Sequence, residues 1–194
     1  MTQLTRFERR KRATRQRLQQ AAANLLIEHG CDAVSVQAIT DRADVGRGTF
    51  YLHFKDKDDI LWAILREQID ALHIQIEQEV HTDQPVDQRV YHIWLKTFQH
   101  IHDHRDLISR VLGERGHMLI ANRFMDYFAA LMIDDLTTHI HKIPIHLPAP
   151  FVANYLLGAQ MRLIVWWIEL GIDYTPEQMT DMFYQMTTSS PAPR

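Results

Sequence analysis

The sequence predicts an all-α protein in two parts: a three-helix N-terminal head with a helix-turn-helix motif, residues 1–57, and a larger C-terminal helical domain, residues 58–194. Along most of the chain, apolar residues recur at the three- and four-residue spacing of buried helix faces. Prolines and glycines interrupt this spacing at a few points, where we expect the connections. A chain of 194 residues, 46% of them hydrophobic, can bury the cores that such a fold needs.

The first helix is expected from Thr14 to His29, with Gly30 as its C-terminal cap. Its buried stripe consists of Leu18, Ala21, Ala22, Leu25 and Leu26. Residues 1–13 carry five basic side chains and little apolar content, which is typical of a mobile arm that orders on DNA or of a solvated leader. Cys31 is the one cysteine of the chain, so it forms no internal disulfide, and we expect it to be a small buried side chain.

The next stretch of the chain predicts two short helices joined by a tight turn. Ser35 can cap a helix over Val36–Ala43 by accepting a hydrogen bond from a backbone N–H of the first turn. Asp44 and Gly46 then tolerate turn geometry, the first through its short polar side chain and the second because it lacks a Cβ. The second helix is expected from Arg47 to His53.

The two faces of this second helix differ in chemistry. At about 100° per residue, an inward Phe50 leaves small, hydroxylic and basic groups facing outward, which suits a DNA groove. Arg47 can reach a phosphate or a guanine edge, and Leu52 can either contact a thymine methyl group or pack half-buried in the head. The candidate DNA contacts are Ser35, Gln37, Arg47, Gly48, Thr49, Tyr51, Leu52, His53, Lys55 and Lys57.

Charge is divided unevenly along the chain. Residues 1–55 contain ten Lys/Arg and five Asp/Glu, a net charge of +5, so residues 56–194 carry −8 of the total of −3. A basic head on an acidic body orients the head toward phosphate and keeps the body away from it. The charge distribution therefore favours a nucleic-acid partner, although the overall charge does not.

Residues of different chemical type between Thr14 and Leu61 share one register with a known signature. They are Ile39, Ala43, Val45, Gly48-Thr49-Phe50-Tyr51, His53-Phe54, Lys57 and Leu61. This pattern resembles the N-terminal signature of the TetR family of bacterial transcriptional regulators. The chain departs from it at Asp44, where the family usually has glycine, and at Gly46, where it usually has a serine cap. Asp can adopt a left-handed conformation at some cost, and glycine is a weaker cap.

Helical spacing continues through the C-terminal domain. Asp56 can cap a helix that runs toward Val80 and is long enough to link the two parts; the resemblance implies that this helix transmits ligand binding as a change in head spacing. Further helices are expected at about 86–102, 107–112, 118–140 and 151–170, with a proline-containing connection at 142–150. Thr175-Pro176-Glu177-Gln178 is a capping box with proline at the first helical position, which predicts one more helix.

The helix over residues 151–170 is apolar almost all round, and the last helix adds several methionines. One face of each can meet the core of the domain, but the remainder needs another partner unless it is only monomer core. We expect these helices to form a four-helix bundle with their copies in a homodimer, as the resemblance also implies. Such a dimer presents its two heads to two DNA half-sites, whose centres lie about one turn of the DNA helix, or a multiple of it, apart. The candidate interface residues are Tyr155, Met161, Ile164, Val165, Met179, Met182, Phe183 and Met186.

A cavity for a small-molecule effector is expected among the middle helices. Its candidate walls are Trp94, Phe98, Met118, Phe124, Tyr127, Met132 and Trp166. An aromatic and methionine stripe at helical spacing forms core more often than pocket, and no charge constellation identifies a ligand.

Other classes of function find little support in the sequence. His100 and His104 are four residues apart and could share a metal ion, but no Cys or carboxylate spacing completes the set, and His139, His141 and His146 form a second cluster. We expect no metal site, no cofactor and no enzyme, because no phosphate loop, nucleophile elbow or metalloprotease pair is present. No run approaches about 18 consecutive apolar residues, so we expect a cytoplasmic protein without a membrane partner.

We therefore expect a homodimeric, DNA-binding transcriptional regulator. The expected form is a repressor that an unidentified small-molecule effector releases from a palindromic double-stranded DNA operator. Two alternatives stay open: a metal-responsive regulator that uses the clustered histidines, and a DNA-binding dimer without a small-molecule effector. The sequence does not distinguish repression from activation.

Overall fold

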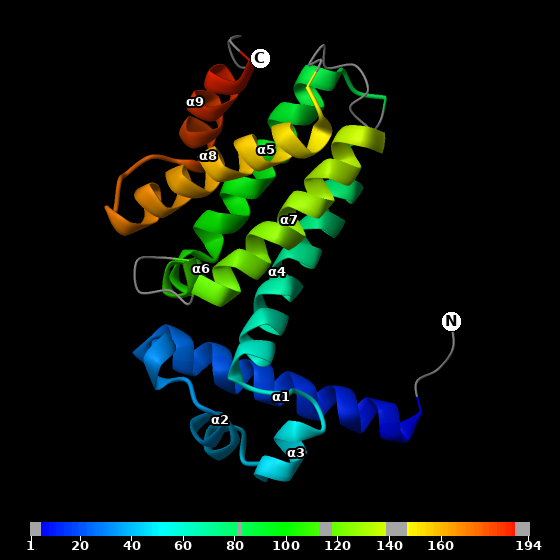
Figure 1. Cartoon of the computed structure of the whole chain (residues 1–194), viewed down its shortest axis with the longest axis vertical. Coiled ribbons are helices and arrows are strands. Elements are labelled where there is room, and N and C mark those ends of the chain that lie inside the picture. Colours follow the sequence, from blue (N-terminus) through cyan, green and yellow to red (C-terminus); the bar gives the residue numbers. More distant parts are fainter. Residues whose placement is uncertain (1–4, 81–82, 113–117, 139–146, 189–194) are drawn as a thin grey trace.

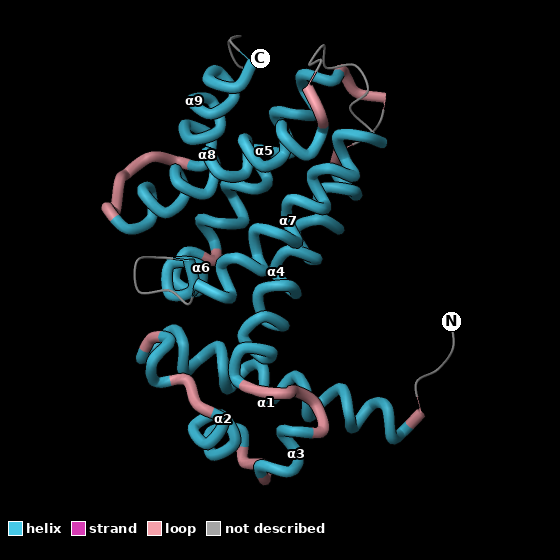
Figure 2. The backbone as a smooth tube through the Cα atoms, in the orientation of Figure 1, coloured by secondary structure: helices cyan, strands magenta, loops and turns pink. Residues whose placement is uncertain are grey.

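The computed structural model describes residues 5–80, 83–112, 118–138 and 147–188. Within these ranges the regular structure is helical and includes no strand (Figure 2). In chain order the helices are α1 (Arg6–His29), the short 3₁₀ helix η1 (Cys31–Ala33), α2 (Val36–Ala43), α3 (Arg47–Tyr51), α4 (Lys57–Glu79), α5 (Val86–Asp103), α6 (Arg105–Leu112), α7 (Met118–Thr138), α8 (Ala149–Glu169) and α9 (Pro176–Thr188). The all-α fold is confirmed.

The helices form a head and a larger upper part (Figure 1). Helix α1 crosses the base of α4, and α2 and α3 lie on the other side of α1. Helix α4 rises from the head and packs against α7, which in turn packs against α8, while α5 packs against α9. The motif that the sequence predicts thus lies at one end of the molecule, far from α8 and α9.

Helix α1 is longer than predicted, because it begins at Arg6 rather than Thr14. A capping box starts it: the Thr5 backbone N–H donates to Glu8 Oε2 at 2.7 Å, and the Glu8 N–H donates to Thr5 Oγ1 at 3.2 Å. Arginine and lysine are good helix formers, so nothing in the basic stretch opposes this start. The expectation of an unstructured arm is wrong for residues 6–13, which form an exposed helical extension.

The helix-turn-helix follows the predicted caps closely. Ser35 Oγ accepts from the Ala38 N–H at 3.1 Å, and Asp44 closes α2 in the left-handed conformation, with φ of 50°. Gly46 starts α3 without a side-chain cap. Helix α3 ends at Tyr51, two residues before the predicted end, and the chain leaves it through a tight turn in which the His53 N–H donates to the Phe50 carbonyl oxygen at 2.9 Å.

A first hydrophobic core joins the head to the base of the upper part. The head contributes fully buried side chains such as Leu18, Ile39 and Phe50. Leu107, from α6, and Ile120, from α7, belong to the same cluster. The core therefore crosses the domain boundary that we place after residue 57, and that boundary stays a prediction.

A second core lies between α5, α8 and α9. The rings of Trp94 and Phe183 lie 4.8 Å apart between centroids, and those of Phe98 and Trp167 lie 6.0 Å apart, all edge to face. The predicted capping box of α9 is present, because the Thr175 N–H donates to Gln178 Oε1 at 2.9 Å and the Gln178 N–H to Thr175 Oγ1 at 3.3 Å. This box starts α9, which packs against α5.

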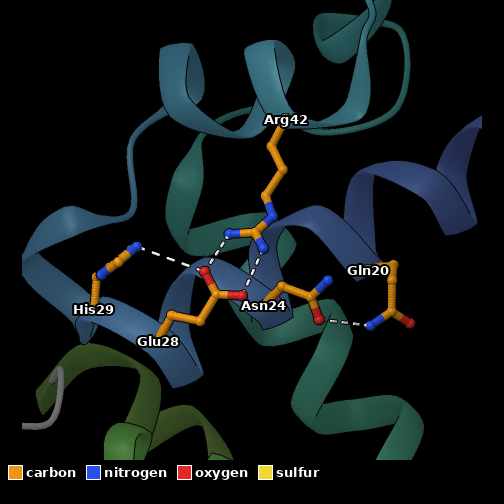
Figure 3. A network of polar contacts seen from close by, with 5 residues as sticks. All are labelled: Gln20, Asn24, Glu28, His29 and Arg42. Atoms are coloured by element: carbon orange, nitrogen blue, oxygen red, sulfur yellow. Dashed lines mark hydrogen bonds and ion pairs between the residues drawn. The ribbon is translucent and has the colours of Figure 1, made fainter.

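An exposed ion pair fastens α2 to the second half of α1 (Figure 3). Both terminal nitrogens of Arg42 donate to the Glu28 carboxylate, at 2.5 and 2.6 Å. The bidentate contact with Arg42 is the main reason that the pKa of Glu28 lies below its usual value. His29 Nε2 lies 3.5 Å from the same carboxylate, while Gln20 donates to Asn24 one turn earlier on α1.

Candidate nucleic-acid interface

Helix α3 has one buried face and one open face. Phe50 is completely buried, with its ring 5.8 Å from that of Phe54 between centroids. On the open face Tyr51 is 59% exposed and Leu52 is 75% exposed. The alternative in which Leu52 packs half-buried within the head is therefore wrong, and its side chain is available for an outside contact.

The start of α3 leaves room for close approach. A Cβ added to Gly48 would meet no atom of the described chain within 4 Å. Arg47 beside it is exposed, and Thr49 is half-buried with its side chain at the flank of the helix. A DNA backbone or base edge can therefore come closer to α3 at Gly48 than a larger residue would allow.

Two predicted contacts on α2 already have partners within the chain. The Ser35 hydroxyl oxygen accepts the capping hydrogen bond, which leaves its O–H free to donate outward. Gln37 is exposed and donates through Nε2 to Asp41 Oδ1 at 2.5 Å. Gln37 would have to exchange this contact for one to DNA.

The segment after α3 adds basic groups beside the motif. Lys55 is exposed, and its backbone N–H donates to Asp59 Oδ2 at 3.0 Å. Lys57 begins α4 and is half-buried. Burial, and then the positive charges of Arg15 and Lys11, lower the pKa of His53. His53 is therefore suited to act as a neutral hydrogen-bond partner of DNA rather than as a cation.

Sequence reasoning missed two arginines of α1 that hold the motif in place. Arg15 Nη1 donates to the His53 carbonyl oxygen at 3.0 Å, and its guanidinium lies 4.2 Å from the centre of the Phe54 ring. Arg17 Nη2 donates to the Ala43 carbonyl oxygen at 2.5 Å. Both arginines lie on the flanks of the buried stripe of α1. This position was the one feature of the sequence that could have indicated a contact with the rest of the head. They anchor the two ends of the motif from within the chain.

Comparisons with known proteins assign both parts of the chain to one family. Residues 88–189, more than half of the chain, match a family described as transcriptional regulator C-terminal region, and residues 18–64 match bacterial regulatory proteins, tetR family. The chain belongs to the TetR family of transcriptional regulators. It is a DNA-binding regulator with an N-terminal helix-turn-helix domain and a C-terminal helical domain.

Curated relatives of this TetR-family chain match its N-terminal part. HTH-type transcriptional regulators from Staphylococcus aureus strains USA300 and NCTC 8325 are each 34% identical to it over 77 residues. The match covers 38% of this chain and 42% of theirs, so the chain matches less than half the length of these relatives.

Solved structures share the fold over most of the chain. A regulator from Syntrophomonas wolfei superposes with a TM-score of 0.76 at 20% identity, covering 92% of this chain and 94% of that one. The fatty acid degradation regulator FadR from Bacillus halodurans gives 0.71 at 17% identity, over 89% and 93%. NalD, the secondary repressor of a Pseudomonas aeruginosa multidrug efflux pump, gives 0.69 at 17% identity, over 94% and 98%.

Most of the predicted effector walls pack in or against the two hydrophobic cores of the described chain, and their role in binding an effector stays a prediction. Trp94 and Phe98 are buried in the second core, with Met132 and Trp166 packed against it. Phe124 packs on the first core, and the Tyr127 hydroxyl donates to Asp70 at 2.6 Å. The side chain of Met118 lies outside the described residues. Three clefts formed by the described residues include none of the seven.

The predicted dimer residues divide between the inside and the surface. Ile164, Met179 and Phe183 are almost fully buried in the second core of the same chain, so assigning them to a partner surface is wrong. Tyr155 is 68% exposed and Met186 is 82% exposed. The other three are Met161 and Val165, which are half-buried, and Met182, which is 41% exposed.

The described histidines form no complete metal site. The rings of His100 and His104 lie 4.5 Å apart between centroids, while His102 stacks on Trp167. In the part of the chain that the structure describes, no group of three His, Cys, Asp or Glu side chains could hold a metal ion. His139, His141 and His146 lie outside the described residues.

Proposed function

We propose that this TetR-family regulator is a homodimeric repressor that binds a palindromic DNA operator through α3 and leaves it when a small-molecule effector binds. In this proposal the protein acts in the cytoplasm, where its DNA is, and it catalyses no reaction. Residues 1–57 serve as the DNA-binding domain, and residues 58–194 serve effector binding and dimerisation.

The observation that carries the proposal is the open face of α3. Arg47 and Leu52 are the base readers in it, and Thr49 and Tyr51 contact phosphate oxygens. The surrounding phosphate contacts are Ser35, Gln37, His53, Lys55 and Lys57, with Gly48 providing close approach. All of these lie at the end of the molecule that carries the positive charge.

The exposed apolar surface of α8 supports a dimer. By length and composition alone, α8 could cross a membrane, but the core helix of a soluble protein passes the same test. Within this chain, 33% of its most apolar 18-residue window is buried, so much of that window is open to a partner. Phe151, Tyr155, Gly158 and Arg162 follow one stripe on its exposed side. Nothing lies within 4 Å of a Cβ added to Gly158, so a partner helix can approach closely there. Met182 and Met186 of α9 extend the surface.

The fold shared with ligand-binding regulators supports an effector. One solved neighbour, FadR from Bacillus subtilis, was crystallised with stearoyl-CoA, and NalD is described as a repressor. We place the effector site between the helices of the C-terminal domain, without assigning it to the seven predicted wall residues. Effector binding favours a head spacing that no longer fits the operator.

Binding to the DNA upstream of the protein's own gene tests the proposal. Fluorescence anisotropy should show that Arg47→Ala weakens binding by about 1–3 kcal/mol if it reads a base. Tyr51→Phe should weaken it less, because only the hydroxyl is lost. Arg110→Ala, an exposed arginine of α6, is the matched control and should bind as the wild type does. Undiminished affinity in both α3 variants would remove the assigned roles.

The two alternatives are separated from the proposal by further titrations. A screen of small molecules against the protein–DNA complex should find at least one that releases the DNA. Zinc or nickel binding at micromolar concentration, lost in His100→Ala, would favour the metal-responsive regulator instead.

The affinity of the protein for DNA should fall steeply as the salt concentration rises, because several phosphates are neutralised in the complex.

A further inference from the structure

A groove of about 510 Å³ opens between the head and the C-terminal domain. It is lined by one stripe of α1, one stripe of α4 and Arg123 of α7. Four arginines reach it: Arg12 and Arg15 from the head, Arg66 from α4, and Arg123. Most of the groove lining comes from α1 and α4, and α4 lies on the opposite side of α1 from α3 (Figure 1). No residue of α3 lines the groove, although its Arg15 and Asp59 bond the backbone of His53 and Lys55.

The acidic side chains of the groove already have partners. Asp59 Oδ2 accepts the Lys55 backbone N–H at 3.0 Å, and Glu67 Oε2 accepts from Gln19 Nε2 at 3.0 Å. Asp70 Oδ1 accepts the Tyr127 hydroxyl at 2.6 Å. Each carboxylate thus has part of its hydrogen-bonding capacity engaged by neutral donors of the chain.

The arginines are less well compensated. Arg12 and Arg123 make no ion pair with any residue that the structure describes. The Arg123 guanidinium lies 5.0 Å from the centre of the Trp62 ring, and that of Arg66 lies 5.2 Å from the centre of the Tyr127 ring. Arg66 Nε is 3.6 Å from Asp70, which is a loose contact. Aromatic faces hold these guanidinium planes without neutralising them.

We propose that this groove binds a small polyanion that carries phosphate or carboxylate groups. Arg12 of the head would hold one end of it, and Arg66 and Arg123 of the C-terminal domain the other. Guanidinium forks donate two parallel hydrogen bonds to such groups, which makes arginine the favoured side chain for them. A bound anion also relieves the repulsion between like charges that share one groove. It would tie the head to the C-terminal domain without covering α3.

Isothermal titration of the DNA-free, full-length protein with pyrophosphate tests the proposal, with citrate as the carboxylate probe. The wild type should bind at least one of the two with a submillimolar Kd at one site per chain. Arg12→Ala and Arg123→Ala should each weaken binding at least ten-fold. Arg12 is exposed, so we expect its variant to fold and to report on the groove even if Arg123→Ala is unstable. Arg110→Ala is the matched control and should bind as tightly as the wild type.

Pyrophosphate could also bind the DNA surface, and a further variant separates the two sites. The double variant Arg47→Ala/Lys55→Ala should keep pyrophosphate binding while it loses DNA binding. Two results would overturn the groove proposal. In the first, the wild type binds neither probe. In the second, binding survives both groove variants and disappears in the double variant. DNA binding by the same preparations is measured separately, so a failure here leaves the proposed function standing.

Discussion

Arg17 in α1 donates a hydrogen bond through Nη2 to the carbonyl oxygen of Ala43 at 2.5 Å, and the same nitrogen lies 3.4 Å from the Asp44 carbonyl oxygen. Ala43 is the last residue of α2, and Asp44 follows it in the left-handed conformation. Carbonyl groups at a helix end lack intrahelical partners, and a guanidinium supplies both hydrogen bonds and a favourable charge there. Arg17, one of the basic residues of the head, thus serves the turn of the motif rather than the DNA.

Replacing Arg17 should therefore disturb the motif. We expect Arg17→Ala to lower the free energy of unfolding in urea by about 1–2 kcal/mol, because a hydrogen bond to a charged donor is lost and the carbonyl group of Ala43 loses its partner. Gln16→Ala, the neighbouring exposed side chain, should change it by less than about 0.5 kcal/mol. Equal stability of the two variants would show that the contact contributes nothing.

Leu52 should contribute to DNA binding but not to stability. Its side chain is 75% exposed, so Leu52→Ala should leave the urea midpoint unchanged. Loss of an apolar contact with one methyl group should weaken operator binding by roughly 1 kcal/mol, or about five-fold, in an anisotropy titration. Leu119→Ala, an exposed leucine of α7, is the control. If both variants bind DNA like the wild type, Leu52 does not touch the bases.

His100 should make stability depend on pH. Burial lowers its pKa to about 4, with the charge of His104 acting in the same direction and that of Asp103 opposing it. The unfolded chain, with an ordinary histidine pKa near 6.5, takes up the proton first as the pH falls. The stabilising contribution is therefore present above about pH 6.5 and is lost as the pH falls toward 4.

Urea titrations at pH 7.5 and pH 5.0 measure this effect. The wild type should lose roughly 1–2 kcal/mol over that interval, less than the whole pKa displacement would give, because the ring keeps part of its contact with water. His100→Gln should lose less, whereas His92→Gln on the same helix should lose as much as the wild type. The same pH response in His100→Gln and the wild type would contradict the prediction.

Tyr155 should lie in the dimer interface. Its side chain is 68% exposed in the single chain, on the exposed stripe of α8 that begins at Phe151. Tyr155→Asp would bury an unpaired charge between the two copies, so the dimer dissociation constant should rise at least about ten-fold. Analytical ultracentrifugation measures it, with Ile74→Asp, at an exposed apolar site of α4, as control. An unchanged dimer in Tyr155→Asp would place the interface elsewhere.

Local signals in the sequence predicted most of the helices. Ser35, Asp56 and Thr175 cap the helices they were expected to cap, because a cap needs only a side chain and the backbone two or three residues away. The same holds for Gly30, whose N–H donates to the Leu26 carbonyl oxygen at 2.9 Å. The early start of α1 was missed, although Thr5 and Glu8 have the spacing of a capping box.

The outward face of α3 could also be predicted, since one buried aromatic at a known helical angle determines which neighbours face away. The apolar residues of α8 and α9 could not be divided in the same way. Ile164 and Phe183 face the second core, whereas Tyr155 and Met186 face outward, although all four are apolar residues at helical spacing. Helix α8 is apolar almost all round, and methionines lie on both the buried and the exposed side of α9, so periodicity cannot tell which of these residues meet the chain's own core.

By itself, the sequence determined where the helices lie, how they are capped and which residues of the motif face outward, because these depend on neighbours within one or two turns. Only the tertiary structure decided which apolar faces pair and where the long arginine side chains end. Arg15 and Arg17 bond carbonyl groups 38 and 26 positions away, while Arg12 and Arg123 line one groove built from three helices. Such contacts depend on packing between segments far apart in the chain, which local periodicity does not encode.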